Sequence, residues 1–273
     1  MKIENLYMFP QDEKAHLITY IRDNPLEMNN DPRPTILICP GGGYEWTSDR
    51  EAEPVALQFL ARGYNVFVLK YSVAKMASEL RPLCEAALAM KHIREHAQKY
   101  NIDPKKVYIM GFSAGGHLAC SLGVYWNHDK VKKALGDSSD GQICRPDAMV
   151  LCYPVITATC ETHLGTLHNF CGTNTPNDEL LNLFSLDLHV DTDTPPAFIW
   201  HTENDGSVPV QNSKNLAEAL TKNGVKHELV LFPDGYHGLS LATHETCHDI
   251  PENNPHPASV WVELADKWLK NLK

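Results

Sequence analysis

A chain of 273 residues, of which 43% are hydrophobic, is long enough to bury a sizeable core, and no linker in it marks a division into two domains. Its 34 acidic residues exceed its 24 basic residues, which gives a formal charge of -10 at pH 7. This charge repels phosphate backbones and anionic membrane surfaces, so we expect neither nucleic acid nor a membrane as a partner.

No segment of the sequence has the pattern of a membrane span or a secretion signal. Uncharged apolar runs stay below the roughly 20 residues that cross a bilayer, and the stretch MKIENLYMFPQDEKAHL lacks the apolar region of a signal peptide. The eight cysteines have no C-x-x-C spacing, and several lie within apolar runs, as small buried hydrophobic residues do. We therefore expect a cytoplasmic protein with reduced thiols.

Short apolar runs alternate with longer amphipathic stretches, which is typical of βαβ units. Strands are predicted at residues 16–22, 35–40, 65–71, 106–110, 148–155, 197–202 and 227–232, and helices at 53–62, 82–100, 114–126, 211–223 and 258–272. The central runs are nearly continuous, as in parallel strands covered on both faces, whereas residues 16–22 alternate and fit an antiparallel strand at the N-terminal edge. The sequence predicts one α/β domain over residues 1–273, with a doubly wound, mostly parallel sheet of about eight strands and helices on both faces.

A long insertion at about residues 156–195 separates two of the predicted strands and contains the leucine-rich stretch DELLNLFSLDL. Loops of this length in compact domains are often lids or binding elements. Its apolar side chains either close one side of a shallow pocket or pack onto the sheet; they are Leu180, Leu181, Leu183 and Phe184. A small lid is one expected role of the insertion.

The sequence GFSAGGH at residues 111–117 directly follows the predicted strand KVYIM and leads into a helical pattern. The turn between them has to be tight, and Gly111 and Gly115 avoid clashes there while Ser113 stays exposed at the apex beside a helix N-terminus. The alternative is a helix-capping serine in a glycine-rich turn. The strand–turn–helix context favours a nucleophilic serine.

The sequence PGGGY at residues 40–44 follows the first parallel strand. Three glycines let the backbone approach a reacting carbonyl, so Gly42 and Gly43 are expected to form an oxyanion hole with the amide of Ala114. A plain flexible turn is the alternative. The aromatic residues near these segments either line an acyl or alcohol pocket or belong to the core; they are Tyr44, Trp46, Tyr153 and Tyr236.

Two further loops supply an acid and a base. HTENDGSVP begins within the strand AFIWHT, so Asp205 lies at a strand's carboxyl end and is predicted to orient the base, with Glu203 as its rival. PDGYHG follows the last strand, and His237 lies there in a glycine-flanked loop. Although a lone histidine is more often structural, the order Ser113, Asp205, His237, each after a different strand, is that of a catalytic triad.

The segments PGGGY, GFSAGGHLA, SLDLHVDTDTPPAFIWHTENDGSVP and FPDGYHG together resemble the α/β-hydrolase superfamily. More narrowly, they resemble small esterases related to hormone-sensitive lipase and to acetylxylan and other carbohydrate esterases, from about residue 35 to the end. Pro40 stands where many relatives of the lipase branch have a histidine, which favours the carbohydrate-esterase side. The resemblance implies the α/β-hydrolase fold and a hydrolase without a cofactor.

These residues predict a serine carboxylic-ester hydrolase that works through an acyl-enzyme. Its expected substrate is a small molecule or oligosaccharide that carries short acyl esters such as acetate. A serine peptidase, a formamidase or a thioesterase on the same fold is the alternative. A non-catalytic binding protein is disfavoured because all three triad roles are filled, and the oligomeric state is not predicted.

One competing pattern is HETCH at residues 244–248, which matches the H-E-x-x-H of zinc peptidases. A zinc peptidase needs this pattern on a supported helix with a third ligand downstream. Here Pro251, Pro255 and Pro257 follow, and Asn254 occupies the third histidine position. We predict no catalytic metal site, and expect either an adventitious surface metal site or a short helix that flanks the active-site mouth.

Overall fold

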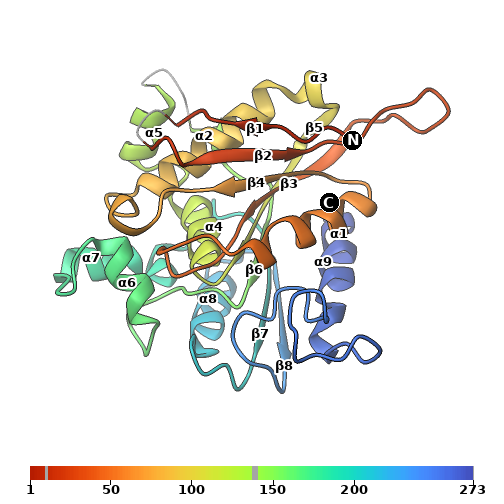
Figure 1. The fold of residues 1–273 in the computed structure, drawn as a ribbon. Coiled ribbons are helices and arrows are strands. Elements are labelled where there is room, and N and C mark those ends of the chain that lie inside the picture. The colour runs from red at the N-terminus through yellow and green to blue at the C-terminus, as the bar shows by residue number, and fades with distance from the viewer. Residues whose placement is uncertain (10–11, 137–140, 273) are drawn as a thin grey trace.

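The computed structural model describes residues 1–9, 12–136 and 141–272. These residues form an eight-stranded sheet with the order β1-β2-β4-β3-β5-β6-β7-β8 (Figure 1). β2 is antiparallel to both of its neighbours, whereas β3 to β8 are parallel to one another. The strands are β1 (Asn5–Leu6), β2 (His16–Tyr20), β3 (Arg33–Cys39), β4 (Asn65–Lys70), β5 (Ile102–Phe112), β6 (Met149–Cys152), β7 (Ala197–Thr202) and β8 (His227–Phe232). The predicted mostly parallel sheet is confirmed.

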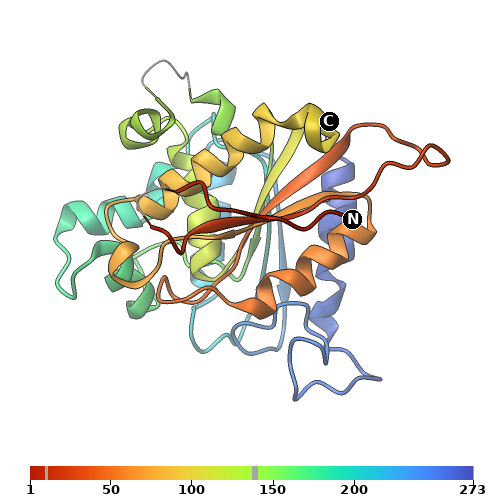
Figure 2. The same ribbon diagram turned by 45° about the horizontal axis from the view of Figure 1, so that its top comes forward.

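Helices cover both faces of the sheet, as Figure 2 shows. α1 and α9 pack on one face, and α2, α4 and α8 pack on the other, so that the sheet separates two hydrophobic cores. The α-helices are α1 (Glu53–Ala61), α2 (Arg81–Glu95), α3 (Ala97–Tyr100), α4 (Ala114–Tyr125), α5 (Asp129–Leu135), α6 (Leu164–Cys171), α7 (Asp178–Phe184), α8 (Gln211–Lys222) and α9 (Trp261–Lys270). Short 3₁₀ helices are η1 (Asp49–Glu51), η2 (Ala74–Met76), η3 (Gln142–Cys144), η4 (Leu186–His189) and η5 (Pro257–Val260). The expected α/β-hydrolase fold is present.

Three predicted elements differ in detail from the structure. The antiparallel strand expected at the sheet edge is β2, but the short β1 pairs outside it. The helix predicted over residues 82–100 is divided at His96, whose φ of -104° and ψ of 19° are not helical. The strand predicted over residues 148–155 ends at Cys152, because Tyr153 has a φ of 38° and Pro154 has no amide to donate to a neighbouring strand.

The insertion at residues 156–195 contains α6, α7 and η4, which lie together beside the α4 side of the sheet (Figures 1 and 2). α7 starts at Asn177, whose side chain accepts a hydrogen bond from the Leu180 amide at 3.0 Å and caps the helix. Phe184 at the other end is fully buried, and Leu181 and Leu183 pack against the same core. For Leu181, Leu183 and Phe184 the structure therefore shows inward packing, whereas Leu180 is half-buried and is not part of this core.

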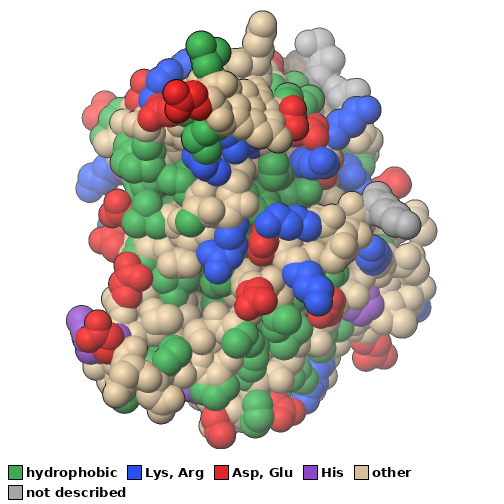
Figure 3. Space-filling model, turned by 90° about the vertical axis from the view of Figure 1, so that its right-hand side faces the viewer, with side chains coloured by type: hydrophobic (Ala, Val, Ile, Leu, Met, Phe, Trp, Pro, Cys, Tyr) green, Lys and Arg blue, Asp and Glu red, His purple; other side chains and the backbone are tan. Residues whose placement is uncertain are grey.

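Acidic and basic side chains are interspersed on the face drawn in Figure 3. Within the described ranges, no helix combines the length and apolar character that crossing a membrane requires. All eight cysteines lie in the described part of the chain as free thiols, and five of them are buried. Their expected role as small hydrophobic side chains therefore holds for most of them.

Candidate active site

Ser113 lies in a sharp turn between the end of β5 and the start of α4. Its φ of 52° and ψ of -118° are strained for a residue with a side chain. The turn depends on glycine, because a Cβ on Gly111 would lie 2.0 Å from the Gly115 carbonyl oxygen and a Cβ on Gly115 would lie 2.1 Å from that of Cys39. α4 therefore starts against the ends of β3 and β5, and Ser113 projects from the carboxyl edge of the sheet.

The structure brings Ser113, His237 and Asp205 into one hydrogen-bonded line. His237 Nε2 lies 2.7 Å from Ser113 Oγ, and His237 Nδ1 lies 2.7 Å from Asp205 Oδ2. With its proton on Nδ1, the imidazole donates to the carboxylate and accepts from the serine hydroxyl. Each side chain comes from the loop after a different parallel strand, which is why residues so distant in sequence meet.

Asp205 is held in place by donors on both of its oxygens. Oδ1 accepts hydrogen bonds from the amides of Ser207 and Val208 at 2.8 and 2.9 Å, and Oδ2 lies 3.3 Å from Nε2 of the buried His201. Burial alone would raise the pKa of Asp205, but the hydrogen bonds from His201 and His237 outweigh it and hold the pKa below its ordinary value. Asp205 is therefore a carboxylate at neutral pH.

Glu203, the rival acid, is exposed to solvent, and its backbone amide pairs with the Phe232 carbonyl at 2.8 Å. Its side chain has no part in the line to Ser113. The sequence analysis did not single out His201, although this residue stands first in HTENDGSVP. Its contact with Asp205, four residues later, depends on the turn that follows β7.

The PGGGY segment forms a loop at the carboxyl end of β3, next to Ser113; residues 40–44 are called the oxyanion loop below. Gly42 has a φ of 124°, and a Cβ there would lie 2.3 Å from the Trp46 carbonyl oxygen, so a larger residue does not fit. The amides of Gly42, Gly43 and Ala114 donate no hydrogen bond to another described residue. These amides are free to bind an oxygen of a ligand.

Neighbouring side chains anchor the oxyanion loop. The Tyr71 hydroxyl donates to the Pro40 carbonyl at 2.6 Å, and Asn169 Nδ2 of α6 donates to the Gly43 carbonyl at 2.9 Å. The insertion thus contacts the loop directly. The peptides that carry the Gly42 and Gly43 amides are held separately, because the Gly41 carbonyl accepts from the Ser48 amide and the Gly42 carbonyl accepts from the Glu45 amide, both at 2.9 Å.

A cavity of about 280 Å³ lies beside Ser113. Most of its lining residues have polar or charged side chains, and they come from the oxyanion loop, the segment before α1, the insertion and the loops that carry Asp205 and His237. The lining residues are Gly42, Gly43, Glu45, Trp46, Ser48, Arg50, Glu51, Ser113, His163, Gly165, Asn169, Ser207, His237 and Gly238. The insertion contributes one wall through α6 and the residue before it. None of the leucines considered for a lid is part of this lining.

Of the four aromatic residues predicted near the substrate, one lines the cavity. Trp46 is 60% exposed at its edge. Tyr44 and Tyr153 are buried below the site, so for them the core alternative holds. Tyr236 is exposed but lies outside the lining, and its hydroxyl donates to Asp249 Oδ1 at 2.7 Å.

Tyr44 contacts a buried histidine that the sequence analysis did not single out. Its hydroxyl lies 3.0 Å from His117 Nδ1, and His117 Nε2 lies 3.0 Å from the Phe184 carbonyl oxygen. The imidazole therefore carries its proton on Nε2 and accepts from Tyr44. Burial lowers the pKa of His117 to about 4, although the bond to Phe184 opposes this shift. Neutral His117 joins α4, the oxyanion loop and the insertion.

His163 is a second histidine with a fixed tautomer, and it lines the cavity. Its Nδ1 accepts a hydrogen bond from the Thr166 amide at 3.1 Å and so caps the N-terminus of α6. Burial and the nearby His237 lower the pKa of His163, although Asp205 acts in the opposite direction. The proton of the neutral ring is consequently on Nε2.

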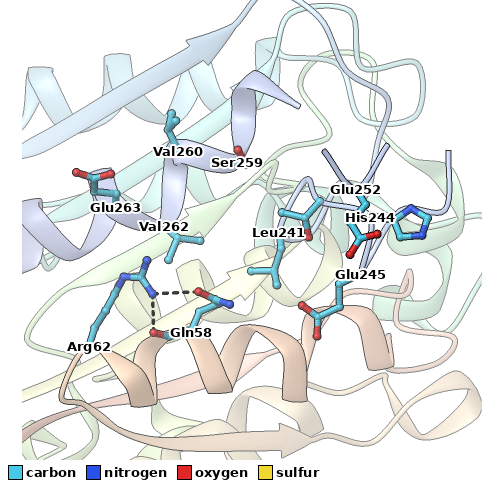
Figure 4. Close-up of a pocket in the computed structure, with 11 residues that line it drawn as sticks. Gln58, Arg62, Leu241, His244, Glu245, Glu252, Ser259, Val260, Val262 and Glu263 are labelled. Carbon is cyan, nitrogen blue, oxygen red and sulfur yellow. Dashed lines mark hydrogen bonds between the residues drawn. The ribbon is translucent and has the colours of Figure 1, made fainter. Parts of the chain in front are cut away.

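A larger hollow of about 600 Å³ lies elsewhere, between α1, the loop before η5 and the start of α9 (Figure 4). It includes His244 and Glu245 of HETCH, whose residues form turns rather than a helix. His244 Nδ1 bonds to the Ile250 carbonyl at 2.8 Å, and no cluster of three metal-ligating side chains occurs in the described part of the chain. The helix considered for this segment is absent.

Known proteins share both the sequence pattern and the fold. The chain is 41% identical over 233 residues to "Endo-1,4-beta-xylanase B" of Butyrivibrio fibrisolvens and 29% identical over 243 residues to the "Acetylxylan esterase" of Xylanibacter ruminicola. These matches cover 84% and 87% of this chain but only 35% and 46% of the two relatives. The chain therefore spans less than half the length of these relatives.

Two crystal structures match over nearly their full length. The acetyl ester-xyloside bifunctional hydrolase from Caldicellulosiruptor lactoaceticus has 36% identity and a TM-score of 0.82, with 98% of this chain and 95% of that chain covered. The carboxylesterase Cest-2923 from Lactobacillus plantarum has 28% identity and a TM-score of 0.84, with 99% and 97% covered. Fold and relatives together define a member of the α/β-hydrolase superfamily.

The family follows from two family models. The model described as BD-FAE matches residues 24–220, and that of the dienelactone hydrolase family matches residues 185–272. The chain belongs to the BD-FAE family. The resemblance to α/β-hydrolase esterases inferred from the sequence is confirmed.

Proposed function

We propose that this protein is a serine esterase that removes short acyl groups, above all acetyl groups, from sugars or oligosaccharides through an acyl-enzyme on Ser113. The observation that carries the proposal is the hydrogen-bonded line from Asp205 through His237 to Ser113 Oγ, at the wall of a cavity next to free backbone amides. This arrangement supplies a nucleophile, a base, an orienting acid and oxyanion donors.

In the first half-reaction, Ser113 Oγ bonds to the ester carbonyl carbon while its proton passes to His237 Nε2. The amides of Gly42, Gly43 and Ala114 donate hydrogen bonds to the carbonyl oxygen as it becomes negative. The proton then passes from the imidazole to the departing alcohol oxygen, and the acyl group stays on the serine.

In the second half-reaction, the imidazole takes a proton from water, whose oxygen attacks the acyl carbon. The proton returns to Ser113 Oγ as the carboxylic acid leaves. Asp205 keeps His237 in the tautomer whose Nε2 accepts a proton, and its negative charge stabilises the imidazolium that forms twice in each cycle. The low pKa of Asp205 supports this role, because the carboxylate stays ionised throughout.

Three observations support a sugar ester as the substrate. Most of the residues that line the cavity have polar or charged side chains, which suit a ligand with several hydroxyl groups. The exposed ring of Trp46 offers a flat apolar surface for the C–H face of a sugar ring. The names of two relatives refer to an acetylxylan esterase and an acetyl ester-xyloside hydrolase.

The test compares the wild-type protein with Ser113→Ala on acetylated xylo-oligosaccharides, aryl acetates, thioesters, formyl amides and peptide amides. We expect the esters to react fastest, and the variant to lose at least about 10⁴-fold in kcat. A fluorophosphonate probe should label Ser113 in the wild type only. Preference for amides or thioesters would reject the substrate class, and activity that survives Ser113→Ala would reject the mechanism.

A further inference from the structure

Glu51 is a buried acidic residue in the cavity wall that the proposed mechanism does not use. It is 3% exposed and ends η1, just before α1. Its carboxylate has a separate donor on each oxygen, since Oε2 accepts from the Gly41 amide at 2.8 Å and Oε1 accepts from the Tyr153 hydroxyl at 2.6 Å. A buried carboxylate is costly unless hydrogen bonds compensate it, so both donors belong to its site.

The bond to Gly41 places Glu51 against the start of the oxyanion loop. Gly41 directly precedes Gly42, and a Cβ on Gly41 would come within 3.1 Å of Ser113 Cβ. The backbone at this point is thus packed against the serine. The Gly41 amide belongs to the Pro40–Gly41 peptide, which this bond fixes. The next peptide, which carries the Gly42 amide, is held by the Ser48 amide, which donates to the Gly41 carbonyl at 2.9 Å.

The bond to Tyr153 reaches the other side of the site. The Tyr153 ring packs edge-on against the His237 ring, with centroids 5.1 Å apart and an interplanar angle of 72°. The Tyr153 hydroxyl also accepts a hydrogen bond from the Ser240 amide at 2.9 Å. Through the Tyr153 hydroxyl, Glu51 therefore fixes the ring that packs against His237. The same hydroxyl connects Glu51 to the segment after His237, because it accepts from the Ser240 amide.

Arg50 adds a second connection to the same loop. Its Nη1 donates to the carbonyl oxygens of Gly238 and Thr246, both at 2.9 Å, and its own carbonyl accepts from Ser240 Oγ at 2.5 Å. Gly238 follows His237 directly in the chain. The dipeptide Arg50–Glu51 is thus bonded at several points to the segment that follows His237, residues 238–246, and at one point to the oxyanion loop.

We infer that Glu51, supported by Arg50, is a positioning residue that fixes the oxyanion loop relative to His237. The inference rests on the proposed function, which assigns the roles of that loop and that histidine. Glu51 acts through Gly41 and Tyr153 rather than on the reacting atoms. A displacement of about 1 Å in a catalytic group can cost about 10²-fold in rate. Loosening the connection through Glu51 should therefore reduce kcat strongly and weaken substrate binding only slightly.

The experiment uses Glu51→Gln, Tyr153→Phe and the double variant, with Glu53→Gln as a matched control. Glutamine replaces one acceptor oxygen by a donor, so that either Gly41 or Tyr153 faces another donor, whereas Tyr153→Phe removes only the hydroxyl. Glu53 lies two residues away at the start of α1 and is exposed. A burst of product from an aryl acetate counts the competent sites, so kcat per competent site is separated from the folded fraction.

We expect Glu51→Gln to lower kcat per competent site by about 10- to 100-fold with little change in KM, and Glu53→Gln to match the wild type. The double variant should be little worse than Glu51→Gln alone, because both changes break the same link. If Glu51→Gln does not fold, Tyr153→Phe provides the same test with a smaller change, and it should lower kcat and leave KM unchanged.

Wild-type kcat per competent site in Glu51→Gln, with only the number of sites or the melting temperature reduced, would overturn the inference in favour of a purely structural role. Fully additive losses in the double variant would reject the connection through Tyr153. A failure of the proposed function looks different, because the wild type itself would then neither hydrolyse esters nor label at Ser113. The inference would fall with it.

Discussion

Asp205 and Glu203 are two residues apart after β7, yet only Asp205 lies next to His237. Asp205→Asn should lower kcat by about 10⁴-fold, because an amide group favours the wrong imidazole tautomer and cannot stabilise its charged form. Glu203→Gln should keep nearly wild-type turnover, since that side chain is in solvent. Steady-state kinetics on an aryl acetate compare the two, and a larger loss in Glu203→Gln would reverse the assignment of the acid.

His117 contacts the oxyanion loop through Tyr44 and takes no part in the proposed chemistry, but it makes stability depend on pH. Its pKa is lowered from 6.5 to about 4 by burial, so the unfolded chain takes up the proton first as the pH falls. The stabilisation that neutral His117 provides is fully present at a pH above the pKa of the unfolded chain. It is lost as the pH falls towards the pKa of the folded protein. Over this window the loss is on the order of 3 kcal/mol.

The corresponding prediction is that His117→Gln is less stable than the wild type at neutral pH but loses less stability on acidification. Urea unfolding at neutral pH and near pH 5 measures both differences. Replacing the exposed His248 by glutamine provides the control, which should follow the wild-type pH dependence. An unchanged pH dependence in His117→Gln would show that other groups dominate the acid response.

How far the sequence predicts individual side chains depends on how local their partners are. Ser113, Asp205 and His237 each stand in a short pattern at the end of a strand, and parallel strands bring such ends together. Glu51 and Tyr153 are separated by 102 residues, and neither lies in a pattern that points to the other. Their contact arises from the packing of η1 beneath the loop after β6, which the sequence does not specify.

At the scale of elements, the long apolar strands and helices were predictable and the short ones were not. α5, α6 and α7 have only 7, 8 and 7 residues, too few turns for a periodic apolar stripe to show. Their stability comes from caps and from packing onto α2 and α4 rather than from intrinsic helix propensity. The position of the insertion as one wall of the cavity therefore required the structure.

The contact of α4 with β3 has no room for an added methyl group. Gly115→Ala would bring a Cβ to within 2.1 Å of the Cys39 carbonyl oxygen, so backbone has to move. We expect a loss of about 3 kcal/mol or more in the free energy of unfolding, together with loss of activity. Gly206→Ala is the control, since a Cβ there has no neighbour within 4 Å. Denaturant titration of both variants checks this, and wild-type stability in Gly115→Ala would contradict it.

For the whole molecule, the small volume of the cavity limits the size of the acyl group. A buried methylene gains about 0.8 kcal/mol only where apolar walls enclose it. Among the described residues that line the cavity of about 280 Å³, Trp46 is the one large apolar side chain, and Leu181, Leu183 and Phe184 of the insertion pack into the core instead. We expect kcat/KM to be highest for acetyl to butyryl esters, to fall by octanoyl esters, and to show no activation at a lipid–water interface.

A series of para-nitrophenyl esters of increasing chain length, measured below and above the solubility limit of the longer members, tests this expectation. Acetylated xylo-oligosaccharides, measured alongside, show whether kcat/KM is higher when the alcohol portion of the ester is a sugar than when it is an aryl group. A steady rise in kcat/KM up to dodecanoyl esters would point to a lipase-like enzyme with an acyl channel.

The hydrogen bond between Ser113 and His237 joins residues 124 positions apart in the chain. A contact between residues so far apart in sequence forms late in folding. Closing so long a loop costs chain entropy before the contact can stabilise the folded state. β8 precedes the loop of His237, and among the described strands it pairs with β7 alone, so the last strand of the sheet has to dock before the base reaches the serine. During refolding from denaturant, the helical circular dichroism signal should therefore return before ester hydrolysis does, and the regain of activity should report the docking of the C-terminal strands.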